Sequence, residues 1–172
     1  MDVEDNNQNN GMLGLILKND QRVEVDPRFK NVSVLVKELS ETNNGEDIPI
    51  SQISIEMLNV ILDYCKRHNW NPPKVSKPLQ SGELQKNLSE QDYLFIKDYP
   101  IYKDNRLNDL LQAAYYLQIQ TLYDVCICRI ATEFYFGKDQ SSFDDLKKKL
   151  QVTEDLTIEQ EEKIQKEYPW IQ

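Results

Sequence analysis

The stretch from residue 110 to residue 134, LLQAAYYLQIQTLYDVCICRIATEF, most constrains the fold of this chain. It is the most apolar part of the sequence, and helical periodicity divides its apolar side chains between two faces. The face expected to pack on a core holds Leu110, Leu111, Ala114, Leu117, Leu122, Val125, Cys126 and Arg129. The second face holds Tyr115, Tyr116, Ile119, Tyr123, Ile127, Ile130 and Phe134. A small domain buries one face of a helix pair easily, so the second face requires a third layer or another protein.

The length and charge of the chain narrow the classes of partner. A chain of 172 residues accommodates one compact domain and an appendage. The formal net charge of -9 opposes binding to phosphate backbones and anionic membranes, because that binding needs clustered Lys and Arg. No window of about 18 apolar residues exists, and the acidic N-terminus lacks the pattern of a signal peptide. We therefore expect a cytoplasmic and nuclear protein that binds neither nucleic acid nor membranes.

The first part of the chain predicts a disordered tail followed by a small α+β region. Residues 1–11 have almost no apolar side chains and are expected to be disordered. Two apolar runs around Asn19-Asp20-Gln21 predict a β-hairpin. The segment SVLVKELSE then predicts a short helix, and IPI a third strand. A longer helix should begin after Ser54, which caps its free amides, and run to about His68.

The second part predicts a loop and then several helices. Residues 71–92 carry three prolines and many polar side chains, which indicates a flexible loop. A helix should begin near Arg106 and the chain should then break at LQIQT, with Thr121 capping a second helix that Gly137 ends. The segments SSFDDLKKKLQV and LTIEQEEKIQKEYPW predict two more amphipathic helices, the last capped by Thr157. Two or three strands followed by five or six helices make an α+β domain with a helical tail.

The sequence offers no convincing catalytic, metal or cofactor site. It has only five glycines and no glycine-rich phosphate loop, and one histidine, His68. Cys65 and His68 with Cys126 and Cys128 could in principle supply four zinc ligands. The one-residue gap in the second pair is unusual for zinc and sends the two thiols to different helical faces. Three reduced, buried cysteines are the preferred interpretation, and the chain is expected to bind partners without catalysis and without a cofactor.

Taken in order, the motifs resemble those of the Skp adaptor family, the linker subunits of cullin–F-box ubiquitin ligases. The resemblance covers about residues 13–170 apart from the loop at 71–92. It rests on a hairpin ending in VEVD, on SVLVKELSE, on IPISQISIEMLNVILDYCKRH, and on LNDLLQAAYYLQIQTLYDVCICRIA. The last of these matches the family pattern LxxLxxAANYLxIxxL. A final segment, LTIEQEEKIQKEYPW, completes the series.

This resemblance implies a fold and a function. It implies a BTB/POZ domain over residues 12–136 and a C-terminal two-helix extension over residues 137–172 that binds F-box proteins. The expected function is that of a non-catalytic adaptor that joins the N-terminal region of a cullin scaffold to an F-box substrate receptor. The second apolar face would then be an interface. Its exposure also leaves room for weak self-association of the chain when it is alone.

The resemblance also implies which residues meet the F-box. By position they are Leu117, Leu122, Val125, Ile127, Ile130, Leu150, Val152 and Trp170. For Leu117 and Leu122, packing in the core is the preferred interpretation. Trp170 is more typical of a partner anchor, because it lies close to the end of the sequence.

The cullin surface would centre on Tyr115 and Tyr116, with help from the segment before Leu107 and from IPISQ. Here the chain departs from the family, whose usual pair is Asn-Tyr. A phenol in place of a short amide changes both size and hydrogen bonding. Two functions therefore stay open: a ligase adaptor, and a structural F-box partner that has lost cullin binding. The sequence does not distinguish a cellular adaptor from one carried by a parasite or a virus.

Overall fold

A computed structural model describes residues 11–43, 46–101, 104–134 and 157–167. The chain divides into two compact units, residues 1–135 and 136–172. The sequence placed this boundary one residue later, after residue 136. Of the expected disordered tail only Gly11 is described, and the helix expected over residues 141–152 lies outside the described residues.

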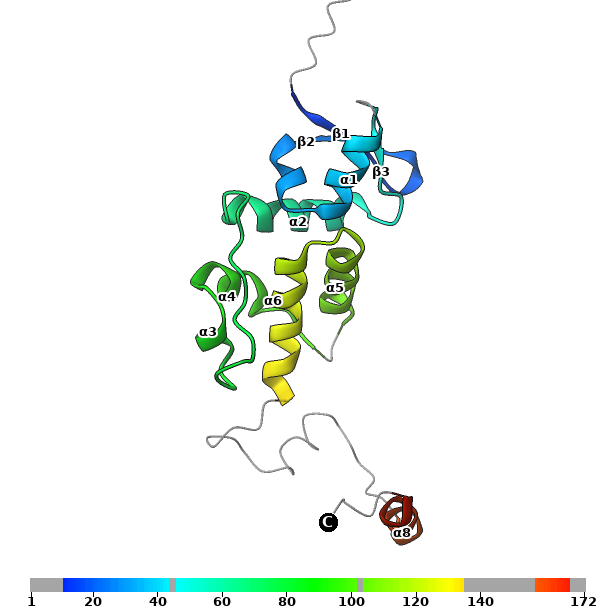
Figure 1. Cartoon of the computed structure of the whole chain (residues 1–172), viewed down its shortest axis with the longest axis vertical. Coiled ribbons are helices and arrows are strands. Elements are labelled where there is room, and N and C mark those ends of the chain that lie inside the picture. Colours follow the sequence, from blue (N-terminus) through cyan, green and yellow to red (C-terminus); the bar gives the residue numbers. More distant parts are fainter. Residues whose placement is uncertain (1–10, 44–45, 102–103, 135–156, 168–172) are drawn as a thin grey trace, which may run out of the picture. The chain divides into compact units, whose positions relative to one another are not determined.

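Three short strands form the sheet of the first unit, in the order β2-β1-β3 (Figure 1). Strands β1 (Leu13–Ile16) and β2 (Arg22–Val25) are antiparallel, and β3 (Ile48–Pro49) runs parallel to β1. The 3-10 helix η1 (Lys18–Asp20) joins the first two strands, and Asn19 within it has a φ of 66°. Asparagine tolerates this left-handed conformation better than most side chains. The predicted hairpin and third strand are confirmed.

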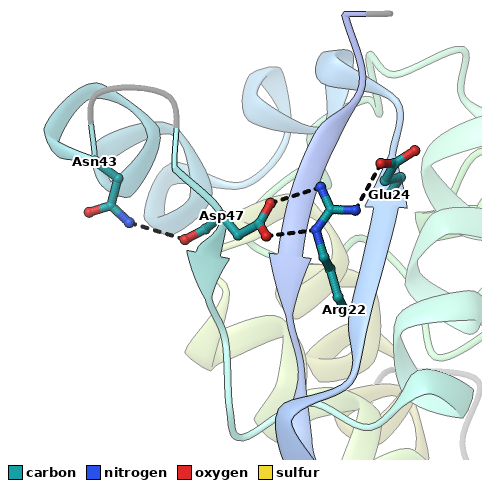
Figure 2. Close-up of polar contacts among 4 residues, drawn as sticks. All are labelled: Arg22, Glu24, Asn43 and Asp47. Carbon is teal, nitrogen blue, oxygen red and sulfur yellow. Dashed lines mark hydrogen bonds and ion pairs between the residues drawn. The ribbon is translucent and has the colours of Figure 1, made fainter. Parts of the chain in front are cut away.

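Gly14 lies in the central strand where an ion pair crosses over it (Figure 2). Arg22 on β2 donates from Nε to Asp47 Oδ2 over 2.6 Å and from Nη2 to Asp47 Oδ1 over 3.1 Å, and Asp47 stands just before β3. A Cβ at Gly14 would collide with the Asp47 carboxylate. Arg22 also binds Glu24 beside it on β2. Exposed pairs of this kind contribute little free energy, so the arrangement of the three strands depends mainly on their backbone pairing.

Ser33 connects two helices that are far apart in the sequence. It follows η2 (Pro27–Asn31) and is the N-cap of α1 (Val34–Thr42). Its Oγ accepts a hydrogen bond from the Val36 amide over 3.2 Å, and its hydroxyl donates to the Leu117 carbonyl over 2.6 Å. Ser33 is completely buried. One side chain therefore satisfies a free amide at the start of α1 and a free carbonyl at the end of α5.

Helix α2 (Ile55–Arg67) lies between the sheet region and the α5–α6 pair (Figure 1). The predicted cap is confirmed, because Ser54 Oγ accepts from the Met57 amide. At the other end, Asn69 has a φ of 48°, and the Trp70 amide donates to the Cys65 carbonyl over 2.8 Å. This is a Schellman motif, which ends a helix with a left-handed residue.

The expected loop over residues 71–92 is partly helical. It contains α3 (Leu84–Asn87) and the start of α4 (Glu90–Ile96). The Asn87 side chain binds the backbone of residues 80, 81 and 83, and Lys77 pairs with Asp124 of α6 over 2.8 Å. The prediction of a plain loop was therefore wrong for the last residues of this segment. Its prolines indicate a loop, and a helix of only four residues is too short to give a clear periodic pattern in the sequence. The flexibility of this segment stays a prediction.

Helices α5 (Arg106–Tyr116) and α6 (Gln120–Ala131) lie side by side as a helical hairpin (Figure 1). Of the side chains expected on the core face, most are buried: Leu110, Ala114, Leu117, Leu122, Val125 and Cys126. Ile119 was expected on the second face and is instead completely buried. Thr121 is not the cap of α6, because the helix already begins at Gln120. The tight turn at Gln118 explains both differences. It buries Ile119, and it lets α6 begin at Gln120, one residue before the cap that was predicted.

The end of α6 also differs from the prediction. The sequence placed it at Gly137, which lies outside the described residues. The α-helix ends at Ala131, and the 3-10 helix η3 (Thr132–Phe134) follows it. A tightened last turn is common at helix ends, and it leaves no glycine signal in the sequence.

In the second unit, α8 (Ile158–Glu167) begins with the predicted cap. Thr157 Oγ1 accepts from the Gln160 amide over 3.3 Å, and Gln160 Oε1 accepts from the Thr157 amide over 2.9 Å. This reciprocal pair is a capping box. A small sheet and several helices confirm the α+β class. Among the helices described in either unit, none combines the length and apolar character needed to cross a membrane.

Replacing Ser33 with alanine should destabilise the first unit by about 2–4 kcal/mol, because the Val36 amide and the Leu117 carbonyl both lose a buried partner. Urea unfolding followed by circular dichroism measures this. Ser40→Ala is the matched control, because the Ser40 hydroxyl donates only to the Lys37 carbonyl at an exposed site. Equal midpoints for the two variants would contradict the role of Ser33.

Candidate protein-binding surfaces

Part of the exposed apolar surface gathers on the α5–α6 hairpin. The large apolar side chains that are exposed in the described residues are Met12, Val34, Leu94, Tyr115, Ile127, Phe134 and Ile158. Of these, Tyr115, Ile127 and Phe134 lie on α5, α6 and η3. Exposed apolar side chains that lie together on a surface are typical of sites that bind another protein.

The first candidate surface is an open pocket of about 780 Å³ at the junction of α5 and α6. We call it the tyrosine pocket, and its lining is Gln52, Leu111, Gln112, Tyr115, Tyr116, Gln118 and Tyr123. The pocket contains both residues predicted to contact a cullin, Tyr115 and Tyr116. The side chain of Tyr123, which the prediction left out, lies in it as well.

The three tyrosines of this pocket have different environments. Tyr115 is 73% exposed, which is high for an aromatic side chain. Its ring lies 6.0 Å from the ring of Tyr123, with 47° between the two planes. Tyr116 is half-buried and packs against the core. The exposed wall of the pocket is therefore an aromatic pair contributed by two different helices.

The turn between the two helices brings these rings together. Gln118 has a φ of 53°, the Ile119 amide donates to the Ala114 carbonyl over 2.9 Å, and the Gln118 amide donates to the Tyr115 carbonyl over 3.1 Å. These are the two hydrogen bonds of a Schellman motif, with glutamine in the position that glycine usually takes. The Ser33 hydroxyl also donates to the Leu117 carbonyl in the same turn, so a residue outside the hairpin stabilises the α5–α6 junction as well.

A smaller pocket of about 340 Å³ adjoins the first, because both are lined by Gln52, Gln112 and Tyr116. Ile53 and Ser54 also line it, so the end of the IPISQ region lies next to α5. This region was expected to contribute to the cullin surface, and the structure brings Gln52 at its end together with Tyr116. Lys18 and Asp109 add charge here, whereas among the residues that the structure describes no Asp, Glu, Lys or Arg lines the tyrosine pocket.

The second candidate surface is the α6 stripe, formed by Ile127, Ile130 and Phe134. Ile127 is 36% exposed and Phe134 is 39% exposed, and Ile130 is half-buried. The spacing of three and four residues places them on one side of the helix and of the 3-10 turn that continues it. Apolar side chains left at the surface in this pattern are typical of a helix that packs against a partner.

The residues expected to bind the F-box separate into three groups. Ile127 and Ile130 lie on the α6 stripe. Leu117, Leu122 and Val125 are completely buried in the core of the first unit, so core packing is the interpretation that the structure favours for them. Leu150, Val152 and Trp170 lie outside the described residues, and their role stays a prediction.

Two surface residues were absent from the predicted site. Tyr123 lies four residues before Ile127 and Phe134 four residues after Ile130, so helical periodicity already placed them on the second face. They were left out because the family resemblance decided the list of site residues. The periodicity alone would have found them.

The cysteines form no site with His68 in the described residues. Cys65, Cys126 and Cys128 are free thiols and all are buried. Burial raises the pKa of Cys65 and Cys126 to about 12 and that of Cys128 to about 11. Across the described part of the chain, no three His, Cys, Asp or Glu side chains come together as a metal site. Neutral, buried thiols are poor nucleophiles and poor metal ligands.

His68 lies in a buried polar cluster between α2 and α4. Its Nε2 lies 2.9 Å from Asp92 Oδ1, although the two groups are not aligned as a hydrogen bond, and its ring packs 4.8 Å from that of Tyr64. Asp92 Oδ2 accepts from the Ser89 hydroxyl, and Ser89 is the N-cap of α4. The side chains of His68 and Asp92 are only 4% and 2% exposed. This cluster joins two helices and is closed to a substrate.

Comparison with protein families gives two matches. The model of the Skp1 family dimerisation domain matches residues 120–171, and that of the Skp1 family tetramerisation domain, a POZ domain, matches residues 12–70. The second match confirms the expected BTB/POZ fold of the first unit. The α6 stripe falls within the first match, and the tyrosine pocket draws residues from both matched regions and from α5 between them.

Individual relatives cover most of the chain. An S-phase kinase-associated protein 1 homolog of Tetrahymena thermophila is 34% identical over 152 residues, which is 87% of each chain. The SCF ubiquitin ligase complex protein SKP1a of Dictyostelium discoideum is 29% identical over 89% of this chain and 91% of its own. The E3 ubiquitin ligase complex SCF subunit sconC of Arthroderma otae is 26% identical over 87% of this chain and 88% of its own.

Replacing Gln118 with glycine should stabilise the chain by about 0.5–1 kcal/mol, because glycine adopts a positive φ without the strain of a Cβ. Thermal and urea unfolding measure the change. Gln112→Gly is the matched control inside α5 and should lose about 1 kcal/mol. A loss of stability for both variants would contradict the Schellman turn.

The raised thiol pKa values predict a dependence of stability on pH. The folded chain keeps protons on Cys65 and Cys126 that the unfolded chain releases above about pH 9. The contribution of the two thiols to stability should therefore be constant below that pH and fall as pH rises toward about 12. Urea midpoints at about pH 8 and about pH 10 test this. Cys126→Ala is expected to lose less stability between the two pH values than the unaltered chain. An equal loss in both proteins would show that the Cys126 thiol is not responsible.

Proposed function

The chain belongs to the Skp1 family, and on this basis we propose that it is the non-catalytic adaptor subunit of a cullin–F-box ubiquitin ligase of the SCF type. It would join the N-terminal region of a cullin scaffold to an F-box substrate receptor. An adaptor of this kind acts by position, because it holds the substrate receptor near the ubiquitin-transfer machinery and raises their effective concentration. The relatives in Dictyostelium and Arthroderma, which carry SCF names, support the proposal.

The observation that carries this proposal is the presence of two surfaces on one helical hairpin. The tyrosine pocket lies at the α5–α6 junction, and the α6 stripe occupies the later turns of α6 and η3. A bridging protein needs two sites that can be occupied together. In the sequence of α6, the buried side chain of Val125 lies between Tyr123 of the tyrosine pocket and Ile127 of the α6 stripe, so this helix contributes to both surfaces.

We assign the two surfaces to two partners. The cullin would contact the tyrosine pocket through Tyr115 and Tyr116. The F-box would contact the α6 stripe, together with Leu150, Val152 and Trp170 of the second unit. Leu117, Leu122 and Val125 would then support these surfaces from the core, without touching a partner themselves.

The proposed role requires no reaction at the chain itself. Within the part of the chain that the structure describes, the single histidine is closed inside the His68–Asp92 cluster, and the three cysteines are buried. We also propose that the protein acts in the cytoplasm and the nucleus, as the sequence leads us to expect. The exposed apolar side chains of the α6 stripe would also permit weak self-association when no F-box protein is bound.

A second candidate function keeps the F-box and loses the cullin. Tyr115 stands where the family usually has asparagine, and its ring is 73% exposed at the centre of the predicted cullin surface. A ring of this size could exclude a partner shaped for a short amide. The chain would then be a structural partner of F-box proteins in an assembly that is not a ligase.

Mixing the purified chain with an F-box fragment and the N-terminal region of a cullin should give a ternary complex in light-scattering chromatography. Ile127→Ala and Trp170→Ala should each weaken F-box binding about tenfold, because each removes an apolar anchor, and should leave cullin binding unchanged. Leu94→Ala is the matched control, because Leu94 is an exposed apolar residue of α4 outside both surfaces.

The same experiment separates the two functions. An F-box complex that excludes the cullin, and that gains it with Tyr115→Asn, would establish the structural partner. Binding to neither protein would refute both functions and leave the fold untouched.

A further inference from the structure

A third surface lies between α2 and α4 and is separate from the two surfaces described above. It is an open groove of about 390 Å³. We call it the α4 groove, and its lining includes Val60, Asp63, Arg67, Leu94, Phe95 and Tyr99. It shares no lining residue with the tyrosine pocket, and it contains no residue of the α6 stripe. A partner in this groove would not use the residues assigned to the cullin and the F-box.

Two aromatic side chains supply apolar surface inside the groove. The rings of Phe95 and Tyr99 lie 5.9 Å apart, and the Phe95 ring also lies 5.2 Å from that of Tyr64, which is completely buried. Phe95 and Tyr99 are half-buried and pack against the core, as Val60 of α2 does. Because the core already orders these side chains, the groove is formed before a partner binds, and association costs less entropy.

A buried polar cluster holds the two walls of the groove together. His68 is the C-cap of α2, and its Nε2 lies 2.9 Å from Oδ1 of Asp92 on α4. Both side chains are almost completely buried. Asp92 lies two residues before Leu94 in the same helix. Contacts inside the chain therefore determine how far α4 lies from α2.

Leu94 is an apolar side chain that the fold leaves at the surface of this groove. It is 50% exposed, whereas its neighbour Phe95 is half-buried. One surface therefore has both an apolar side chain that can insert into a partner and an open apolar groove that can receive one. A surface with both features can bind a second copy of itself across a two-fold axis.

The charges of the groove are self-complementary as well. Asp63 and Arg67 lie four residues apart on α2 and form an exposed pair over 2.7 Å, which contributes little to the single chain. Two α2 helices that meet antiparallel across a two-fold axis bring Asp63 of each copy to Arg67 of the other. Asp63 and Arg67 are the charged residues of the described lining, so the contact is locally neutral although each chain has a formal net charge of -9.

We infer that the α4 groove is an isologous interface between two copies of this chain, with Leu94 of each copy inserted into the groove of the other and two Asp63–Arg67 pairs formed between the copies. A small interface of this kind gives a weak dimer that depends on concentration. The inference does not rest on the proposed adaptor function, because it uses none of the residues assigned to the cullin or the F-box. In an adaptor, such a dimer would bring two substrate receptors into one assembly.

Sedimentation equilibrium of the full chain over a range of concentrations tests the interface. We expect an equilibrium between monomer and dimer, in which Leu94→Ala weakens the dimer about tenfold because it removes the inserted side chain. Ile127→Ala is the matched control and should leave this dimer unchanged, because Ile127 is an exposed apolar residue of the α6 stripe outside the groove.

An exchange of charges distinguishes a contact between copies from an effect on the single chain. Asp63→Arg gives each α2 two cations at these positions and Arg67→Asp gives it two anions, so each variant alone should dimerise at least about tenfold more weakly. An equal mixture of the two variants should form a heterodimer, because opposite charges then meet. Lys66→Asp should have no effect, because Lys66 is the neighbouring exposed cation of α2 and does not line the groove. Circular dichroism shows that each variant is folded.

The remaining outcomes would overturn the inference. A dimer that is weakened by Ile127→Ala and unaffected by Leu94→Ala would assign self-association to the α6 stripe. A mixture of the two charge variants that stays monomeric would show that Asp63 and Arg67 do not meet between copies. An unaltered chain that is monomeric at every concentration would leave the groove to a different protein. These outcomes do not affect binding to the cullin or the F-box, so the adaptor function would stand.

Discussion

The hydrogen bond from Ser33 to the Leu117 carbonyl is the interaction on which the rest of this arrangement depends. It is completely buried and joins residues 84 positions apart. One end is the cap of α1, which belongs to the sheet region, and the other is the turn between α5 and α6, which positions the candidate surfaces. A helix end buried without a partner would carry a large free-energy penalty. By satisfying two helix ends at once, one hydroxyl sets where the binding hairpin lies against the sheet.

Local signals in the sequence were sufficient for the elements that depend on them. Ser54 and Thr157 cap the helices they were expected to cap, and Asn19 lies in the predicted hairpin turn. The predictions that failed concern features that depend on contacts between distant parts of the chain or on an unusual backbone conformation. Ile119 is buried because a left-handed Gln118 redirects the chain, and glutamine gives no sign of a positive φ. Helix α3 is stabilised by one asparagine that binds the backbone of its own loop, which composition does not reveal.

The candidate site shows the same division between pattern and geometry. Periodicity separated a core face from a second face over residues 110–134, and the family resemblance named Tyr115 and Tyr116. Neither could show that Tyr123 faces Tyr115, because that contact depends on the angle of the turn. The resemblance also placed Leu117, Leu122 and Val125 at an interface, and their complete burial in the chain alone agrees with the core packing that periodicity predicted. Residues that shape a surface and residues that touch a partner are easily confused when only a motif is available.

The ion pair that crosses Gly14 has a consequence for how this architecture can grow. The guanidinium of Arg22 and the carboxylate of Asp47 cover the face of the sheet opposite the core, directly over the central strand (Figure 2). A further layer stacked on that face would have to remove water from both charges. The free-energy cost of this desolvation exceeds the gain from their mutual attraction unless the geometry is ideal. A further packing layer is therefore less favourable on this face of the sheet than on the helical side of the first unit. The surface of the α5–α6 hairpin carries exposed apolar side chains, and among the described residues no such charges cover its tyrosine pocket, so a partner can pack there without removing water from an ion pair.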